Sequence, residues 1–308
     1  MEYLVTHTTQ YHYSETASLS YNEAWLTPRT FQAPLFAQTC LEHRIDISPR
    51  PSDQRVFTDF FENQVRYFTV RFPHEATTIT AVSRVRLDLP PPLIGSVEQL
   101  LKEAAGSEAW DSVRHRLHHE LEPNLLDARQ YTLASPLVPV LPDLAAYAAP
   151  SFPEGRPIIE AVYHLMGRIY EEFDFMPGAT TIATPVIEVL REKRGVCQDF
   201  AHLMLGCLRA QGLAARYVSG YIETVPPPGQ EKLQGADASH AWVAVYVPGL
   251  NWLAFDPTNN LLPYDQHITV AWGRDYGDVP PLKGVFFSHG EHKLKVAVDV
   301  ERLTAAAT

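Results

Sequence analysis

The sequence has 308 residues, 45% hydrophobic residues and a formal net charge of −11. This length allows two domains and a sizeable core, and the composition fits an ordinary soluble globular protein. An acidic chain without clustered Lys and Arg is not expected to bind a nucleic-acid backbone. No apolar run approaches the roughly 20 residues of a membrane-spanning helix, so a membrane partner is not expected either.

The start of the chain and its cysteines predict the compartment. Residues 1–7 lack the basic and apolar segments of a secretory signal. The three cysteines, Cys40, Cys197 and Cys207, are too few and odd in number for a disulfide framework, and they fit a reducing compartment. We therefore expect a cytoplasmic protein.

The first 92 residues alternate with a period of two, which is typical of strands. Strands are expected at 3–11, 19–26, 40–48, 56–61, 64–72 and 77–89. Glu62-Asn63 indicates a hairpin between two of these segments, and three prolines at 90–92 end the run. We predict an antiparallel β domain over 1–92 with a structural or substrate-shaping role.

Residues 93–155 are predicted to form a helical connecting region that prolines interrupt. His115, His118 and His119 lie near one face at helical spacing. They lack a Cys or carboxylate partner in a recognisable ligand pattern, and solvated helix histidines are far commoner than metal ligands. We therefore predict no metal site here and no cofactor.

Residues 156–308 are predicted to form the catalytic core. An amphipathic helix begins at Pro157 and ends near Phe173, because its apolar residues recur at helical spacing. The elements expected after it are a short helix over 184–192, a cysteine helix over 197–211, a strand over 215–222, an exposed loop over 225–236 that borders or covers the site, and a hairpin over 239–256.

Cys197 lies in the first turn of the cysteine helix, for which Gly195 is the predicted N-cap and Gly212 the predicted stop. The partial positive charge of a helix N-terminus favours a thiolate, and its free N–H groups offer half of an oxyanion hole. A thiolate nucleophile also needs a histidine within hydrogen-bond reach and a carboxylate that orients this histidine.

The histidine and the carboxylate are expected on one hairpin. His240 and Trp242 share a face of the strand over 239–247, and residues 251–256 return as a second strand. A three-residue loop over 248–250 places Asp256 opposite Trp242 and diagonal to His240 on the same face. A two-residue loop would place them on opposite faces. The odd loop therefore predicts that Asp256 reaches one nitrogen of His240 and leaves the other for the thiol.

Each member of this set also has an ordinary structural interpretation. A cysteine on a buried helix is usually a small hydrophobe, which is the role that we assign to Cys207 and, in a strand, to Cys40. A strand histidine is more often structural, and an Asp before Pro is more often a turn former. The combination of a thiol at a helix start with His and Asp on one hairpin face favours an active site.

The segments that carry these residues resemble the transglutaminase-like superfamily of papain-like thiol enzymes, in its bacterial two-domain branch. The matching segments are Gly195–His202, Ala215–Tyr221, Ser239–Val243 and Phe255–Asn259, in that order, with further likeness at 273–276, at 278–281 and in the opening β region.

The resemblance covers nearly the whole chain and implies an α+β fold. In this fold an N-terminal antiparallel β domain precedes a papain-like core, where a central cysteine helix packs on an antiparallel sheet. The resemblance also implies that Cys197 is the nucleophile, His240 the general base and acid, and Asp256 the orienting carboxylate.

The acyl acceptor stays open, because the superfamily includes enzymes that cross-link glutamine side chains to amines and others that resemble peptidases or amidases. We expect hydrolysis of a peptide or carboxamide through an acyl-thioester, since a cytoplasmic enzyme has little need to cross-link extracellular protein. The alternatives are transamidation to an amine and a non-catalytic peptide-binding protein that keeps the fold. An arylamine acetyltransferase uses a similar triad, but its motifs match less well.

The expected partner is a peptide or protein that carries the target amide. Gln198, Tyr221 and Trp242 are the candidates to line the substrate cleft, and a place in the core is the alternative for Tyr221 and Trp242. Asp199 is assigned to the helix start, where a carboxylate suits the helix dipole, because its charge would oppose a nearby thiolate. No acidic cluster suggests the calcium sites of animal cross-linking enzymes, so calcium dependence is not expected.

Overall fold

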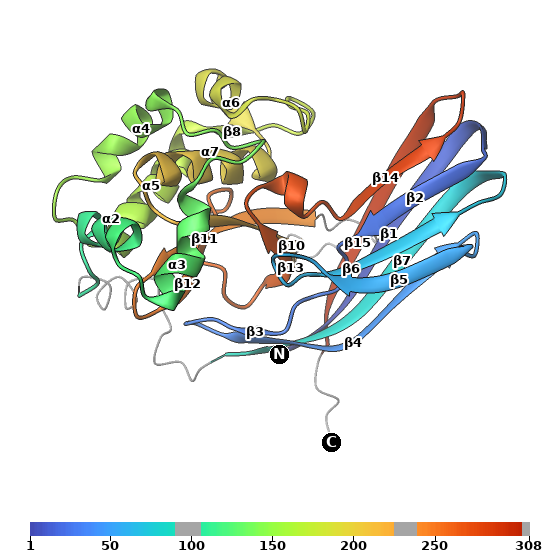
Figure 1. The fold of residues 1–308 in the computed structure, drawn as a ribbon, viewed down its shortest axis with the longest axis horizontal. Helices are drawn as coiled ribbons and strands as arrows, with labels where there is room; N and C mark the ends of the chain where they lie inside the picture. The colour runs from blue at the N-terminus through green and yellow to red at the C-terminus, as the bar shows by residue number, and fades with distance from the viewer. Residues whose placement is uncertain (90–105, 225–238, 304–308) are drawn as a thin grey trace, which may run out of the picture.

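The computed structural model describes residues 1–89, 106–224 and 239–303. Figure 1 shows two parts, a sandwich of long strands and a core in which helices surround a smaller sheet. The predicted loop over 225–236, the three prolines at 90–92 and the predicted boundary between 92 and 93 lie outside the described residues.

The sandwich consists of two antiparallel sheets with the strand orders β15-β1-β7-β4-β3 and β14-β2-β6-β5. Each strand that the sequence predicted before residue 90 has a counterpart. The strands are β1 (Glu2–Ala17), β2 (Leu19–Ala24), β3 (Phe31–Gln32), β4 (Ala37–Ser48), β5 (Asp53–Thr58), β6 (Gln64–Val70), β7 (His74–Asp88), β14 (Leu282–Phe287) and β15 (His292–Leu303). The faces that meet bury Phe68 of one sheet against Ile79 and Ala81 of the other.

The last two strands belong to the sandwich and not to the core. β15 pairs with β1 from Glu2↔Leu303 onward, and β14 pairs with β2 from Leu282↔Ala24 onward. Figure 1 shows β14 alongside β2. Our prediction that 156–308 forms the core alone was therefore wrong for 282–303. Period two identifies a strand but not its partner, so pairing with a distant segment leaves no local signal.

The core helices are arranged around α7, the cysteine helix. They are α2 (Trp110–His119), α3 (Pro123–Arg129), α4 (Pro142–Ala148), α5 (Ile158–Glu172), α6 (Val186–Glu192) and α7 (Cys197–Ala210), with short 3-10 turns at Gln130–Thr132, Ala149–Ser151 and Tyr276–Asp278. α7 is buried on most sides, as its sequence predicted. It ends before Gly212, whose φ of +78° is the left-handed conformation that suits glycine.

The core sheet has the order β12-β11-β10-β13 and is antiparallel. Its strands are β10 (Ala215–Ile222), β11 (Ser239–Val247), β12 (Asn251–Phe255) and β13 (His267–Gly273), and a two-residue pair, β8 (Asp174–Phe175) and β9 (Arg194–Gly195), lies before α7. Ala241, Val243 and Val245 of β11 join the large hydrophobic cluster that contains α7. Burial of each of the two valine side chains contributes about 1.5–3 kcal/mol, which helps to fix α7 on this face. The alternate residues of β11 face the other way and form a separate cluster around Trp242.

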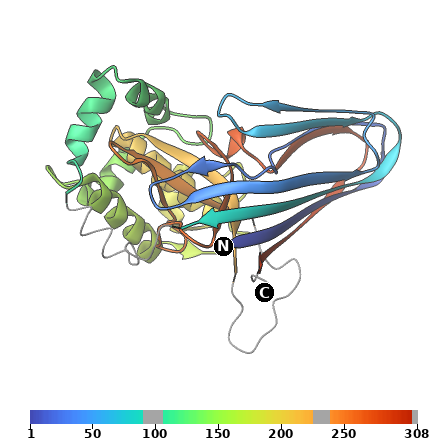
Figure 2. The same ribbon diagram turned by 90° about the horizontal axis from the view of Figure 1, so that it is seen from below.

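The sandwich is attached to the edge strand of the core sheet by side-chain amides. Gln38, which is fully buried, donates to the carbonyl oxygen of Thr269 at 2.7 Å and accepts from its N–H at 2.8 Å. Asn63 pairs in the same way with Trp272, at 2.9 and 3.0 Å. These amides satisfy the backbone groups that an edge strand leaves unpaired. The sandwich end that carries β3 therefore lies beside the core sheet (Figures 1 and 2).

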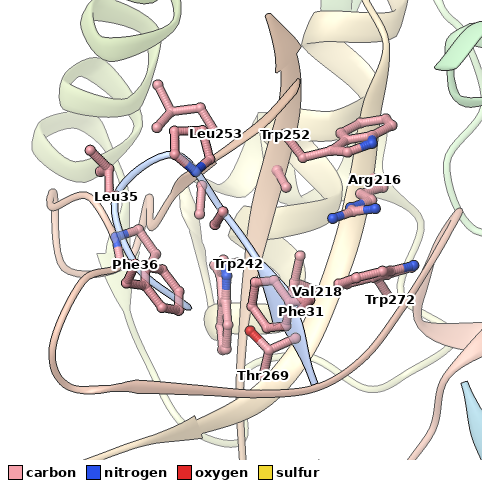
Figure 3. A pocket seen from close by; sticks show the side chains of 15 residues that line it. Phe31, Leu35, Phe36, Arg216, Val218, Trp242, Trp252, Leu253, Thr269 and Trp272 are labelled. Carbon is pink, nitrogen blue, oxygen red and sulfur yellow. The ribbon is translucent and has the colours of Figure 1, made fainter. Parts of the chain in front are cut away.

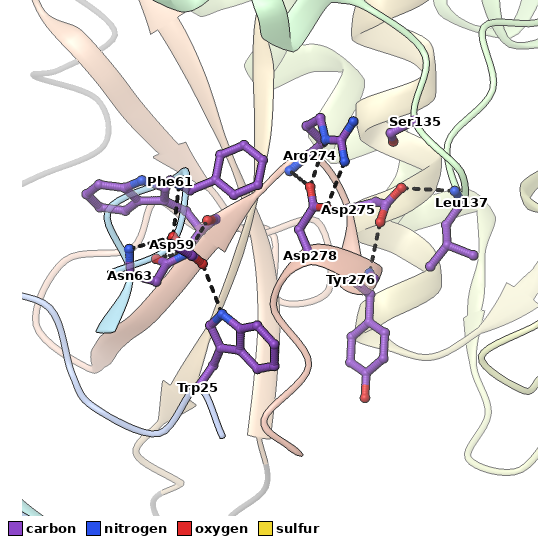
Figure 4. A network of polar contacts seen from close by, with 12 residues as sticks. Trp25, Asp59, Phe61, Asn63, Ser135, Leu137, Arg274, Asp275, Tyr276 and Asp278 are labelled. Carbon is purple, nitrogen blue, oxygen red and sulfur yellow. Dashed lines mark hydrogen bonds and ion pairs between the residues drawn. The ribbon is translucent and has the colours of Figure 1, made fainter. Parts of the chain in front are cut away.

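A polar network supports the same junction (Figure 4). The Asp59 carboxylate accepts hydrogen bonds from the Trp25 indole at 3.0 Å and from the Asn63 side chain at 2.9 Å. Beyond β13, the Asp275 carboxylate accepts from the backbone N–H of Leu137 at 2.9 Å, which anchors the helical region to the core. The sheet that carries the site is thus held from both sides.

Candidate active site

The start of α7 positions Cys197. Val196 is the N-cap, not Gly195 as the sequence suggested, and its backbone N–H donates to Asp199 at 2.8 Å. The Thr180 hydroxyl also donates to this carboxylate, at 2.6 Å. The assignment of Asp199 to the helix start is confirmed. Gly195 is needed for space instead, because a Cβ there would lie 2.8 Å from Cβ of Asp199.

His240 and Asp256 lie together, as the predicted three-residue hairpin loop requires. Val247 pairs with Asn251, which is the register of a three-residue loop. Nε2 of His240 lies 2.7 Å from Oδ2 of Asp256, with 7% and 0% of the two side chains exposed. Because Nε2 is engaged by Asp256, Nδ1 is the nitrogen that remains for Cys197, whose side chain acts to raise the pKa of His240.

The charges in this cluster control the protonation of His240. Burial acts to lower the pKa of His240, but the hydrogen bonds and charges of Asp256 and Cys197 outweigh it and raise the pKa to about 10. Burial likewise acts to raise the pKa of Asp256, but the hydrogen bonds from His240 and His267 hold this pKa well below its usual range. Asp256 and Cys197 thus both favour the imidazolium form of His240.

The sequence did not predict two further partners of Asp256. Nε2 of His267, on β13, lies 2.9 Å from the same oxygen, Oδ2, and the side-chain amide of Asn259 donates to it at 2.7 Å. Oδ1 accepts from the backbone N–H groups of Thr258 and Asn259 at 3.0 and 3.3 Å. Asn259 belongs to a segment that the resemblance quoted, and His267 begins an alternating strand. These two features were the only hints in the sequence that Asn259 and His267 lie near Asp256.

His267 is held in one tautomer. Its ring is 1% exposed, and burial lowers its pKa even though Asp256 acts to raise it. Its Nε2 therefore carries the hydrogen that Asp256 accepts, and its buried Nδ1 has no partner among the described residues. A neutral imidazole in this place supplies one directed hydrogen bond to the carboxylate.

The side chains of His240, Asp256 and His267 also form a group whose ligand atoms lie within 4.8 Å of one another. A metal ion could in principle use two imidazoles and a carboxylate. Both Nε2 atoms are, however, at hydrogen-bond distance from one carboxylate oxygen, so proton-mediated contacts account for the arrangement. His115, His118 and His119, which the sequence placed near one helix face, are not members of this group.

The predicted cleft residues lie in different places. Gln198 follows Cys197 and is half-buried. Trp242 is 1% exposed, and its ring centroid lies 5.9 Å from that of His240 and 5.0 Å from that of His267. Tyr221 is buried and shares a 3.0 Å hydrogen bond with Nδ1 of His7 on β1. Tyr221 therefore joins the core to the sandwich.

Gly220 leaves room for the two strands beside it, β11 with His240 and β13 with His267. It pairs with His240 across β10 and β11. A Cβ on Gly220 would lie 2.1 Å from the carbonyl oxygen of Ile268 and 2.5 Å from the Trp242 ring. Only glycine allows these strands to approach so closely.

The other two cysteines lie in different environments from Cys197. Cys207 is fully buried, and burial raises its pKa to about 12. Burial also raises the pKa of the half-buried Cys40. Both are expected to be poor nucleophiles at neutral pH. Among the described helices, none is long and apolar enough to cross a bilayer.

Two family models match the chain. Residues 3–86 match the bacterial transglutaminase-like N-terminal region, and residues 146–257 match the transglutaminase-like superfamily. An uncharacterized protein of Mycobacterium tuberculosis is 42% identical over 303 residues, which span 97% of this chain and 92% of that protein. An uncharacterized protein of Mycobacterium leprae is 32% identical, with 97% and 98% covered.

Two further similar proteins cover different shares of the chain. A protein-glutamine gamma-glutamyltransferase of Pseudomonas aeruginosa is 34% identical over 107 residues, or 32% of this chain and 16% of that protein. The crystal structure of a candidate cysteine protease from Cytophaga hutchinsonii superposes with a TM-score of 0.75 at 19% identity, covering 100% of this chain and 92% of that one. It shares the fold from the sandwich through the core. The chain belongs to the transglutaminase-like superfamily.

Proposed function

We propose that the protein catalyses thiol-dependent acyl transfer on amide bonds, with Cys197 as nucleophile, His240 as acid and base, and Asp256 as the orienting carboxylate. The observation that carries this proposal is the position of His240 between Asp256 and the Cys197 thiol, whose combined effect raises its pKa to about 10. An imidazolium in such a position stabilises a thiolate nucleophile.

In the first half-reaction the Cys197 thiolate attacks the carbonyl carbon of the amide. Backbone N–H groups at the start of α7 stabilise the developing oxyanion. Nδ1 of His240 then gives its proton to the leaving amine, and the C–N bond breaks to leave an acyl-thioester. Asp256 stabilises the His240 imidazolium while the thiolate attacks, and it holds the imidazole ring in place.

In the second half-reaction His240 removes a proton from the acceptor, which attacks the thioester and releases the thiolate. Hydrolysis, with water as acceptor, yields a carboxylic acid and is the reaction that we favour. A primary amine would instead yield a new amide. This second possibility is supported by the partial similarity to the glutamyltransferase of Pseudomonas aeruginosa.

Alkylation of the thiols by iodoacetamide from pH 4 to 9, with each labelled cysteine identified by mass spectrometry, tests the nucleophile. Fast labelling of Cys197 that extends to acidic pH, and that vanishes in His240→Ala, is expected. Cys207→Ala is the matched control, because it removes a buried thiol of the same helix and should leave this labelling unchanged. Labelling that rises only near pH 8.5, the approximate pKa of a free cysteine, in wild type and His240→Ala alike would favour the peptide-binding alternative.

The acceptor is tested with a library of short peptides that contain glutamine, in buffer alone or with hydroxylamine. New carboxylates or peptide fragments in buffer identify hydrolysis. Hydroxamates that form at the expense of acids show that the thioester accepts amines, and selective reaction with lysine-containing peptides in competition with water identifies transamidation. Every product should be absent with Cys197→Ala and present with Cys207→Ala.

A further inference from the structure

A cavity lies on the face of the core sheet opposite α7, where the sandwich covers it. The cavity has a volume of about 30 Å³, and its walls include Phe31 and Leu35 from the sandwich and Trp242, Trp252 and Trp272 from the core. This volume accommodates a water molecule or an ion of similar size. Figure 3 shows Arg216 of β10 between the Trp252 and Trp272 rings, with Trp242 and Phe31 across the pocket.

Arg216 is the charged group of this cavity. Its guanidinium carbon lies 3.6 Å from the centroid of the Trp272 ring and 4.4 Å from that of Trp252, so two indoles fix its plane. The side chain is 8% exposed. Within the described part of the chain it makes no hydrogen bond or ion pair, and its buried Nε has no partner.

No carboxylate is among the described groups that act on this guanidinium. Burial is the main influence and lowers the pKa of Arg216 to about 9; Tyr131 acts to raise this pKa, and Arg29 acts to lower it. Arg29 lies on the other face of the same indole, 3.5 Å from the Trp272 centroid. Arg29 has partners of its own, since it donates to Asn63 at 2.8 Å and to the Phe61 carbonyl at 3.1 Å.

A buried guanidinium without a partner is costly, and its complement is an acceptor that carries negative charge. We propose that the Arg216 cavity binds a carboxylate-sized monoanion. The ligand is either a free small anion or the carboxylate at the end of a peptide. The site is distinct from the Cys197 centre, from which the Trp242 ring separates it, since that ring also contacts His240 and His267.

The experiment measures the excess ³⁵Cl NMR line width of the full-length protein against chloride concentration. Saturable broadening that sodium formate displaces is expected in the wild type. Arg216→Met should weaken binding by at least about tenfold, the factor that a lost charge-assisted hydrogen bond represents. Arg55→Gln is the matched control, because it removes an exposed guanidinium that lies over the Tyr67 ring and is not part of the cavity lining, so it should leave the saturable component intact.

Two additions make the result decisive. Ala254→Leu fills the cavity and retains Arg216, so it should also abolish the saturable component, and it answers the question if Arg216→Met does not fold. Displacement by N-acetylglycine but not by N-acetylglycinamide assigns the site to a peptide carboxylate, whereas displacement by formate alone assigns it to a free anion. Broadening that is linear, or that persists in Ala254→Leu, would overturn the proposal and leave Arg216 as a structural clamp between indoles.

Discussion

Nε2 of His267 lies 2.9 Å from Oδ2 of Asp256, the same oxygen that accepts the hydrogen bond of His240. The carboxylate is thus aimed at the proposed catalytic histidine by a second, neutral histidine. His267 comes from β13, which pairs with β10 and not with the hairpin that carries the other two residues. We predict that it positions the carboxylate.

His267→Leu is expected to lose this directed hydrogen bond and to leave the buried carboxylate with fewer donors. Loss of a hydrogen bond to a charged group costs about 1.5–3 kcal/mol of unfolding free energy. The pKa of Asp256 should rise as well, so the acid limit of Cys197 alkylation should move to higher pH. His267→Gln, which restores a side-chain N–H, should recover part of both effects. An unchanged pH profile in His267→Leu would contradict the positioning role.

Asp256→Asn is expected to preserve the shape of the site but remove its charge. The pKa of His240 should then fall from about 10 toward its ordinary value of 6.5, because burial opposes the imidazolium and one of its two anionic partners is gone. Turnover at neutral pH should drop by at least about 100-fold. NMR titration of the His240 ring measures the pKa directly. A ring that still titrates near pH 10 in the variant would show that Asp256 is not its main partner.

The stability of the fold should depend on pH through His240. Its pKa in the fold lies above the ordinary value of 6.5, so its contribution is fully present below pH 6.5 and is lost as the pH rises through about 10. The unfolding free energies of wild type and His240→Gln, measured by urea denaturation, should therefore converge between pH 6.5 and 10. A constant difference across this range would mean that His240 is not held as an imidazolium.

Asp256 contributes with the opposite sign. Its pKa is lowered in the fold, so its contribution is present above its ordinary pKa of 3.8 and is lost as the pH falls below it. The buried neutral His267 adds to the acid sensitivity. Because its pKa is lowered in the fold, the unfolded chain binds a proton at this histidine at a higher pH than the folded protein does, and this favours unfolding in acid. Acid unfolding should therefore begin at lower pH in His267→Gln than in wild type, provided that the glutamine keeps its hydrogen bond to Asp256.

Gly220→Ala should destabilise the protein and displace β13, which carries His267, because the new Cβ would lie 2.1 Å from the carbonyl oxygen of Ile268. Overpacking of this kind typically costs about 1–3 kcal/mol or more. Gly167→Ala in α5 is the matched control. Its Cβ would meet nothing closer than 3.8 Å, and replacing glycine in a helix should stabilise by roughly 0.5–1 kcal/mol. Thermal unfolding of the two variants should therefore change in opposite directions.

The sequence predicted the local geometry of the site well. The odd hairpin loop placed His240 and Asp256 on one face, and the register Val247↔Asn251 confirms it. The cysteine helix was also predicted, because its apolar spacing and its glycine stop are properties of a single segment. Such features depend on neighbours in the chain, and periodicity reports them directly.

The remaining features depend on partners far along the chain. His267 reaches Asp256 only because β13 lies beside β10. For Tyr221 the sequence left both a cleft and a core position open, because a hydrogen bond to the distant His7 leaves no local signal. The N-cap moved from Gly195 to Val196 because the Asp199 carboxylate folds back onto the backbone. Periodicity shows which face a residue occupies but not which element covers that face.

The pairing of β1 with β15 has a consequence for how the protein is made. The core sequence lies between β7 and β14, so a ribosome must synthesise all of it before the last two strands of the sandwich emerge. Until then β1 has a neighbour on one side only, and its other edge is exposed. The sandwich therefore starts to form first and is completed last, and during the interval the nascent chain carries an open edge that is vulnerable to aggregation.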